Sequence, residues 1–100
     1  MSNLAALYDI QGRYDEAEPL YKDCLAKCKM ILGQDHPNTL NTMNSLAVSY
    51  DIQGKYEKAE PLHEECLAKY EMTLGPDHPQ TLNTRNNLAA LLKVKVNMTR

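Results

Sequence analysis

The sequence repeats itself with a period of 42 residues, and this repeat constrains the fold more than any other feature. The segment Tyr-Asp-Ile-Gln-Gly at 8–12 returns at 50–54, Cys-Leu-Ala-Lys at 24–27 returns at 66–69, and Leu-Gly-x-Asp-His-Pro at 32–37 returns at 74–79. Repeats of this length are typical of proteins in which small units of secondary structure stack in a row. The chain is therefore predicted to be an array of similar units, each packed against its neighbours.

Each unit is predicted to be a pair of antiparallel helices. Apolar residues recur at spacings of three and four, which is the helical pattern, and no alternation of period two is sustained. A glycine follows each of the first four apolar stretches, as expected at helix ends. The predicted helices span about 1–11, 14–32, 37–53, 56–74 and 79–95. The predicted fold class is all-α, an α-solenoid of about two and a half repeats: a partial repeat at 1–36, a full repeat at 37–78 and a terminal half repeat at 79–100.

Two prolines conflict with this helical interpretation. Pro19 and Pro61 lie inside the second and fourth predicted helices, where a proline removes a backbone hydrogen bond and can cost about 3 kcal/mol. Because both copies of the repeat keep the proline, we expect a bend or an irregular first turn and not a broken helix.

Charge, hydropathy and cysteine content exclude several classes of partner. The formal net charge of -2 provides no basic surface for a nucleic-acid backbone. No stretch approaches the roughly 18 apolar residues of a membrane span, and residues 1–3 do not open a signal peptide. The three cysteines are an odd number and are expected to be reduced thiols. The sequence therefore predicts a cytoplasmic protein that binds neither nucleic acid nor membranes.

The order of residues within the unit resembles the tetratricopeptide repeat. The positions that carry the resemblance in the full repeat are Leu46, Ala47, Tyr50, Gly54, Tyr56, Ala59 and Cys66. The unit is longer than the family's usual ~34 residues. With Asn-Asn-Leu-Ala at 86–89 and Tyr-Glu-x-Ala-Glu-Pro-Leu at 56–62, it looks like the repeats of kinesin light chains and nephrocystin-type proteins. The resemblance implies a scaffold or adaptor module that binds a peptide or helix of a protein partner in its concave groove.

Two sets of residues could suggest metal or acid–base chemistry. Cys24, Cys28, His63 and Cys66 could be imagined as metal ligands, but zinc needs four convergent ligands and free cysteine also packs as a small hydrophobe. The Asp-His pairs at 35–36 and 77–78 recur at the repeat period beside glycine and proline, as expected of residues that start helices. No nucleophile or second carboxylate completes a catalytic set. We therefore expect buried packing for the cysteines, no metal, no cofactor and no enzymatic activity.

Asparagines on the first helix of each unit are the strongest candidates for a binding site. Asparagine is a poor helix former, so a row of asparagines on a helix needs an explanation. The candidates are Asn41, Asn44, Asn83, Asn86 and Asn87. By the resemblance, this row faces the concave groove and hydrogen-bonds the backbone of an extended peptide. The alternative is that the asparagines bond across neighbouring helices and stabilise the stack.

A second function remains open beside peptide binding. The chain could be a structural spacer or a self-associating fragment of a longer array, with no ligand of its own. The last predicted helix favours end-to-end association, because its apolar residues have no following helix to cover them. These residues are Leu88, Leu91, Leu92, Val94 and Val96.

Overall fold

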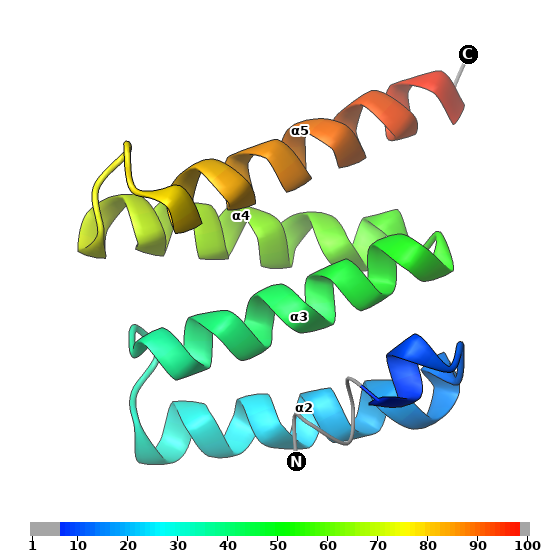
Figure 1. The fold of residues 1–100 in the computed structure, drawn as a ribbon, viewed down its shortest axis with the longest axis horizontal. Helices are drawn as coiled ribbons and strands as arrows, with labels where there is room; N and C mark the ends of the chain where they lie inside the picture. The colour runs from blue at the N-terminus through cyan, green and yellow to red at the C-terminus, as the bar shows by residue number, and fades with distance from the viewer. Residues whose placement is uncertain (1–6, 99–100) are drawn as a thin grey trace.

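The computed structural model describes residues 7–98 as a row of antiparallel helices (Figure 1). The helices are α2 (Tyr14–Ile31), α3 (Pro37–Gln53), α4 (Tyr56–Thr73) and α5 (Pro79–Met98). Residues 7–10 are also helical and form the end of the first predicted helix, whose residues 1–6 lie outside the described part. No strand occurs between residues 7 and 98. The prediction of an all-α solenoid is confirmed, and α5 runs about one turn further than expected.

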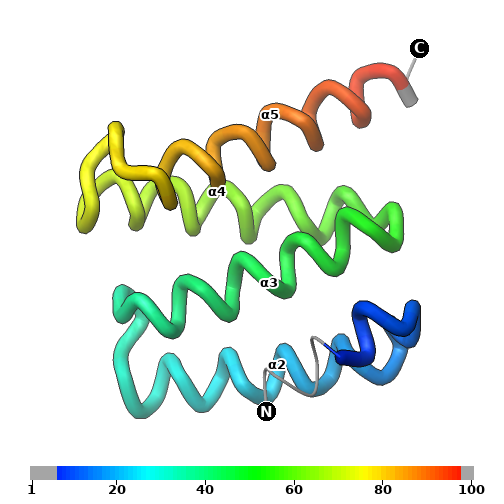
Figure 2. The backbone as a smooth tube through the Cα atoms, in the orientation of Figure 1, coloured from blue at the N-terminus to red at the C-terminus, as the bar shows by residue number. Residues whose placement is uncertain are grey.

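The helices stack in chain order, each against its neighbour (Figure 2). The fold is a slab with extents of 43 × 34 × 18 Å. Cα atoms of α3 and α5 approach each other within 8 Å, whereas those of α2 and α4 do not. The first helices of successive units are therefore closer together than the second helices. The closer pair, α3 and α5, carries the predicted asparagine row.

Glycine makes the turn within each helix pair. Gly54 has a φ of 78°, a left-handed conformation that residues with a Cβ rarely adopt. Its N–H donates to the carbonyl of Asp51 at 3.0 Å, and the Lys55 N–H donates to the carbonyl of Tyr50 at 2.9 Å. These bonds satisfy carbonyls that the end of α3 would otherwise leave without a donor. The turn places Asp51, in the last turn of α3, next to α4.

The Asp-His pairs start the helices, as expected, and the two residues of the first pair have different structural roles. The imidazole of His36 caps α3, because its Nδ1 accepts the N–H of Asn38 at 3.1 Å. His78 makes the same bond to the N–H of Gln80. Asp35 does not cap the helix and instead pairs with Lys69 at 3.1 Å. Asp35 and His36 therefore both have structural roles.

Helices α2 and α4 continue through their prolines. Pro19 and Pro61 lie inside helices of 18 residues each, so neither proline breaks its helix. At the start of α2, the carbonyl of Arg13 accepts the N–H groups of both Glu16 and Ala17, at 3.2 and 3.0 Å. A shared acceptor of this kind is common at helix ends and tightens the first turn.

The core lies between α2, α3, α4 and α5. Its buried apolar residues are Ala17, Tyr21, Leu25, Leu40, Met43, Leu46, Tyr50, Ala59, Cys66, Tyr70 and Leu91. The apolar face predicted for α3 is therefore buried. The equivalent face of α5 is not: Leu82 is 42% exposed, whereas its counterpart Leu40 is 1% exposed. The difference arises because α4 covers Leu40, whereas no helix among the described residues covers Leu82.

The expectation that all cysteines are buried is correct only for Cys66. Cys66 is fully buried, and its Sγ donates to the carbonyl of Leu40 at 3.6 Å. Burial raises the pKa of its thiol to about 12. Cys24 and Cys28 are half-buried instead. The first turns of α3 cover Cys66. No described helix covers Cys24 and Cys28 on α2 in the same way.

This packing predicts the effect of changing the volume at Cys66. Cys66→Leu adds carbon atoms to a filled position between α3 and α4 and should destabilise the protein by about 1–3 kcal/mol. Cys66→Ala removes only the sulfur and should cost less. Thermal unfolding followed by circular dichroism compares the two variants. A leucine variant as stable as the parent would contradict the packing described here.

Candidate functional site

The five candidate asparagines lie on α3 and α5. Asn41 and Asn44 are one turn apart on α3, and Asn83 and Asn86 occupy the equivalent positions on α5, each 42 residues later. Asn41, Asn83 and Asn86 are exposed, whereas Asn44 and Asn87 are half-buried. The row is therefore mostly accessible from solvent.

The asparagine side chains make no hydrogen bonds to other described residues. Across residues 7–97, Asn38 is the only asparagine in a side-chain-mediated bond, and it contributes its backbone N–H and carbonyl. The Oδ1 of Asn44 is also buried without a donor. Buried polar atoms are nearly always paired, so this oxygen is an exception that needs an explanation. No side-chain hydrogen bond among the described residues supports the alternative that the asparagines connect neighbouring helices.

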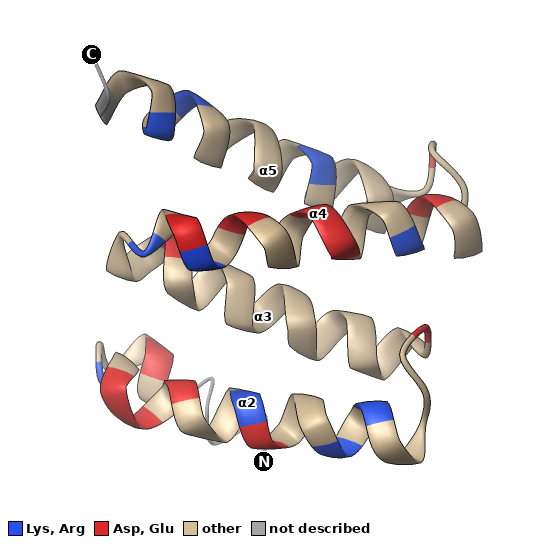
Figure 3. Cartoon of the chain, turned by 180° about the vertical axis from the view of Figure 1, so that it is seen from behind, with Lys and Arg blue, Asp and Glu red and all other residues tan. Residues whose placement is uncertain are grey.

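The helix that carries Asn41 and Asn44 is almost uncharged. Asp51 is the single charged residue between Pro37 and Gln53. Figure 3 shows α3 without charged residues over most of its length, while acidic and basic residues gather on α2 and α4. Two acidic residues of α4 pair with basic residues of α5, Glu60 with Lys95 at 2.7 Å and Glu71 with Arg85 at 3.1 Å. The asparagine row thus offers amide groups on a surface with little charge.

Two pockets adjoin the row, one at each end of the contact between α3 and α5. A pocket of about 300 Å³ at the helix starts is lined by Pro37, Asn38, Asn41, Tyr70, Leu74 and Gln80. A second pocket of about 210 Å³ lies near the opposite end of α3 and is lined by Asp51, Tyr56, Asn87, Ala90, Leu91 and Val94. Two of the predicted asparagines therefore border concave surface, and the other three do not line either pocket.

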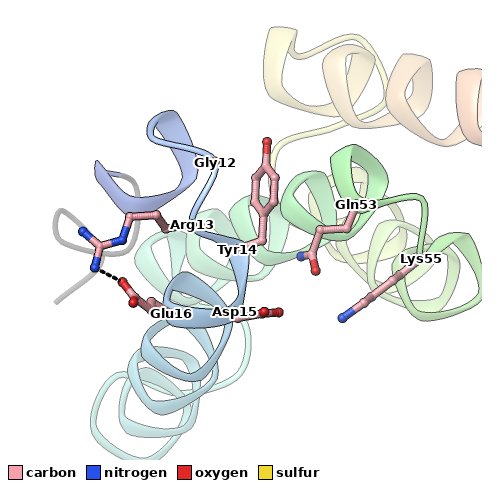
Figure 4. Close-up of a pocket in the computed structure, with 7 residues that line it drawn as sticks. All are labelled: Gly12, Arg13, Tyr14, Asp15, Glu16, Gln53 and Lys55. Carbon is pink, nitrogen blue, oxygen red and sulfur yellow. Dashed lines mark ion pairs between the residues drawn. The ribbon is translucent and has the colours of Figure 1, made fainter.

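A larger pocket of about 440 Å³ lies away from the asparagines (Figure 4). It is formed by the turn between the helices of the first pair and by the end of α3, and its lining residues are Gly12, Arg13, Tyr14, Asp15, Glu16, Gln53 and Lys55. Arg13 pairs with Glu16, and Lys55 pairs with Glu18. Asp15 also lines the pocket and has no ion pair with another described residue, but no serine, cysteine or histidine lies in the lining to complete a catalytic set with it.

A buried imidazole–carboxylate pair on α3 and α4 was not predicted from the sequence. His63 is fully buried, and its Nε2 lies 2.8 Å from Oδ2 of Asp51. The equivalent residues in the preceding unit are Tyr21 and Asp9, whose side chains bond at 2.9 Å. Burial and the bond to Asp9 raise the pKa of the Tyr21 hydroxyl. The recurrence of aspartate at 9 and 51 was the available signal for this contact.

The described residues contain no arrangement suited to a metal. No group of three or more His, Cys, Asp or Glu side chains converges between residues 7 and 97. Two of the candidate metal ligands have other contacts: His63 contacts Asp51, and Cys66 contacts the backbone of Leu40. In the same part of the chain, no helix is both long and apolar enough to span a membrane.

Comparison with known families identifies the repeat. The sequence matches the tetratricopeptide repeat family over residues 1–72 and again over residues 52–93. The chain belongs to the tetratricopeptide repeat family. The resemblance seen in residues 46–66 is thus confirmed along most of this tetratricopeptide repeat chain. No curated protein matches the sequence significantly.

Solved structures place this tetratricopeptide repeat protein with the kinesin light chain type. A crystal structure of BtubC (BKLC) from P. vanneervenii has 28% sequence identity and a TM-score of 0.86, and the match covers 94% of this chain and 37% of that one. A putative kinesin light chain from Podosopora anserina, described as having nearly identical TPR-like repeats, also has 28% identity and a TM-score of 0.86. That match covers 98% of this chain and 46% of the other.

The tetratricopeptide repeat chain spans less than half the length of these similar structures. Its family and fold indicate a protein-interaction module, of a kind that typically serves as a non-catalytic scaffold. The division into units at residues 36 and 78 remains a prediction.

Proposed function

We propose that the chain is a non-catalytic interaction module that binds an extended peptide of a partner protein along the asparagine row of α3 and α5. The observation that carries this proposal is the set of asparagine amides, three of them exposed, that make no hydrogen bond to other described residues. A side chain that stabilised the stack would be bonded within it. Amides left without partners are suited to bonds with another molecule.

The chemistry of the row favours recognition of a peptide backbone. An asparagine amide donates through its nitrogen and accepts through its oxygen, which matches the N–H and C=O of a peptide bond in any sequence. The nearly uncharged α3 adds little electrostatic selection of its own. The three cysteines are free thiols, and we place the module in the cytoplasm, where thiols stay reduced.

A peptide-display selection tests this proposal. A random 12-residue library is selected on the intact chain, and an enriched peptide is titrated into ¹⁵N-labelled protein. We expect the largest chemical-shift changes at Asn41, Asn44, Asn83 and Asn86, with small changes on the outer residues of α2. Enrichment of peptides that perturb only α2 or α4 would contradict binding along the row, and failure to enrich any peptide would favour the spacer.

End-to-end self-association is the second candidate, and the exposed face of α5 favours it. Leu82 and Leu92 are 42% and 41% exposed, although their counterparts Leu40 and Tyr50 on α3 are buried beneath α4. A face built like that of α3 is suited to receive a helix of the α4 type. A second copy of the chain offers such a helix in α2, whose Cys24 and Cys28 are only half-buried although their counterparts Cys66 and Tyr70 on α4 are buried.

Sedimentation over a range of concentrations measures this association. We expect dimers or longer oligomers at high concentration, and we expect Leu82→Glu with Leu92→Glu to make the protein monomeric by placing charge on the apolar face. Glutamates at the exposed Met72 and Lys58 serve as a control on α4. A parent chain that stays monomeric at the highest concentrations would eliminate self-association.

A further inference from the structure

Two equivalent aspartates differ in how their carboxylates are satisfied. Both oxygens of Asp9 accept a hydrogen bond, Oδ2 from the hydroxyl of Tyr21 and Oδ1 from the hydroxyl of Ser49, each at 2.9 Å. Asp51 lies 42 residues later. Its Oδ2 contacts His63, but its Oδ1 is buried with no donor.

The sequence explains this difference. The residue 42 positions after Ser49 is Leu91, which has no hydroxyl to donate. The second unit therefore keeps the aspartate and loses one of its two donors. A carboxylate oxygen buried without a donor is costly, because it gives up its bonds to water and gains none in exchange. Nothing in the packing of α3 against α4 and α5 repairs this loss.

A pocket lies beside the incompletely satisfied carboxylate. Asp51 is the only charged residue among the six that line the 210 Å³ pocket between α3, the start of α4 and α5. Its side chain as a whole is 25% exposed and lines the pocket, whereas the Oδ1 atom itself is buried when the pocket is empty. Ala90, Leu91 and Val94 supply apolar walls. The volume is below the roughly 300–1,000 Å³ of pockets that hold drug-sized ligands, so it suits a single side chain.

We infer that this pocket accepts a lysine side chain of the bound peptide, with the ammonium group at Asp51 and the methylene stem against Ala90 and Val94. The inference rests on the proposed function, because it names a residue that the peptide would carry. Hydrogen bonds between an ammonium and a carboxylate are about twice as strong as neutral ones. Lysine also buries its methylenes along apolar surface while its charged end reaches a polar group.

The preference for a lysine can be measured with one-residue probes. Nα-acetyl-lysine N-methylamide and its norleucine analogue share an aliphatic stem and differ by the ammonium group. Both are titrated into ¹⁵N-labelled intact chain, with the backbone signals of Asn87, Ala90 and Val94 as the readout. We expect the lysine probe to bind at least fivefold more tightly than the norleucine probe.

Two variants test whether the carboxylate of Asp51 is the group that selects lysine. Asp51→Asn keeps an acceptor for His63 but removes the charge, and it should reduce the preference below twofold. Asp9→Asn removes the equivalent carboxylate of the preceding unit and should leave the preference unchanged. If Asp51→Asn does not fold, the comparison of the two probes on the parent chain keeps the test decisive, because it needs no variant.

This experiment tests the lysine pocket separately from peptide binding by the asparagines. A combined Asn44→Ala and Asn86→Ala variant should retain the lysine preference, because neither residue lines this pocket. Equal binding of the two probes to the parent chain overturns the inference, as does a preference that survives Asp51→Asn. Neither result bears on whether the asparagines hold a peptide backbone.

Discussion

Replacing Met43 by alanine is expected to destabilise the protein by about 2–5 kcal/mol. Met43 is fully buried in α3, in the same cluster as Leu40 and Leu46. The shorter side chain loses its transfer free energy and leaves a cavity that the neighbours fill only in part. Small domains have a total stability of about 5–15 kcal/mol, so this loss should lower the unfolding midpoint strongly.

The chain supplies a matched control for this prediction. Met72 lies on α4 and is 86% exposed, so Met72→Ala removes the same atoms from a position that contacts little. Its effect should stay within about 0.5 kcal/mol. Urea unfolding followed by circular dichroism compares the parent and both variants. Equal destabilisation by the two alanines would show that the core does not lie where the structure places it.

The large effect expected at Met43 follows from the position of α3 in the stack. Helix α3 contacts α2, α4 and α5, whereas α2 contacts only α3 among these helices. In stacked repeats, stability is approximately the sum of each unit's own stability and its interfaces with neighbours. A cavity in α3 weakens interfaces with the units on both sides, so we expect the unfolding of the whole chain to respond.

Much of the fold could be predicted because the repeat marks its own boundaries. Predicted and observed bounds of α3 coincide at Pro37 and Gln53. Proline has no N–H to lose at the first helical position, and Gly54 takes the left-handed conformation that ends the helix. These two residues act locally, so their effect can be inferred without knowing what surrounds them.

Burial could not be predicted in the same way, because it depends on the neighbours that each copy of the repeat has. Leu40 and Leu82 occupy the same position in the repeat, yet one is buried and the other is exposed. Thr39 and Thr81 are both fully buried, but Thr39 donates to the carbonyl of Gly33 whereas the hydroxyl of Thr81 has no partner. Equivalent residues therefore have different surroundings.

The asparagines could be singled out from the sequence and their surroundings could not; their role in binding stays a prediction. The asparagines were identified because amides are unusual on helices. The unpaired oxygen of Asp51 was missed because it depends on Leu91, which stands at the repeat position of Ser49 on a helix that meets Asp51 only in three dimensions. A position-by-position comparison of the two units shows this change, but only the structure shows which side chain loses its donor.

Removing two asparagines should weaken peptide binding at least tenfold. Asn44→Ala combined with Asn86→Ala removes amides at equivalent positions of α3 and α5, each of which would make one or two bonds to the peptide backbone. Loss of hydrogen bonds whose partners then stay unsatisfied typically costs about 1–3 kcal/mol. The stability of the free protein should hold or rise, because alanine favours the helix and the Oδ1 of Asn44 has no donor to lose.

Binding of a display-selected peptide to this double variant, measured by fluorescence anisotropy together with its melting temperature, tests the central claim most directly. Asn97→Ala, an exposed asparagine near the end of α5, is the control. If the asparagines bind the peptide, the double variant loses at least tenfold in affinity and melts no lower than the parent, while the control keeps both properties. A double variant that keeps its affinity and melts at a clearly lower temperature would contradict the proposed function and favour the structural spacer.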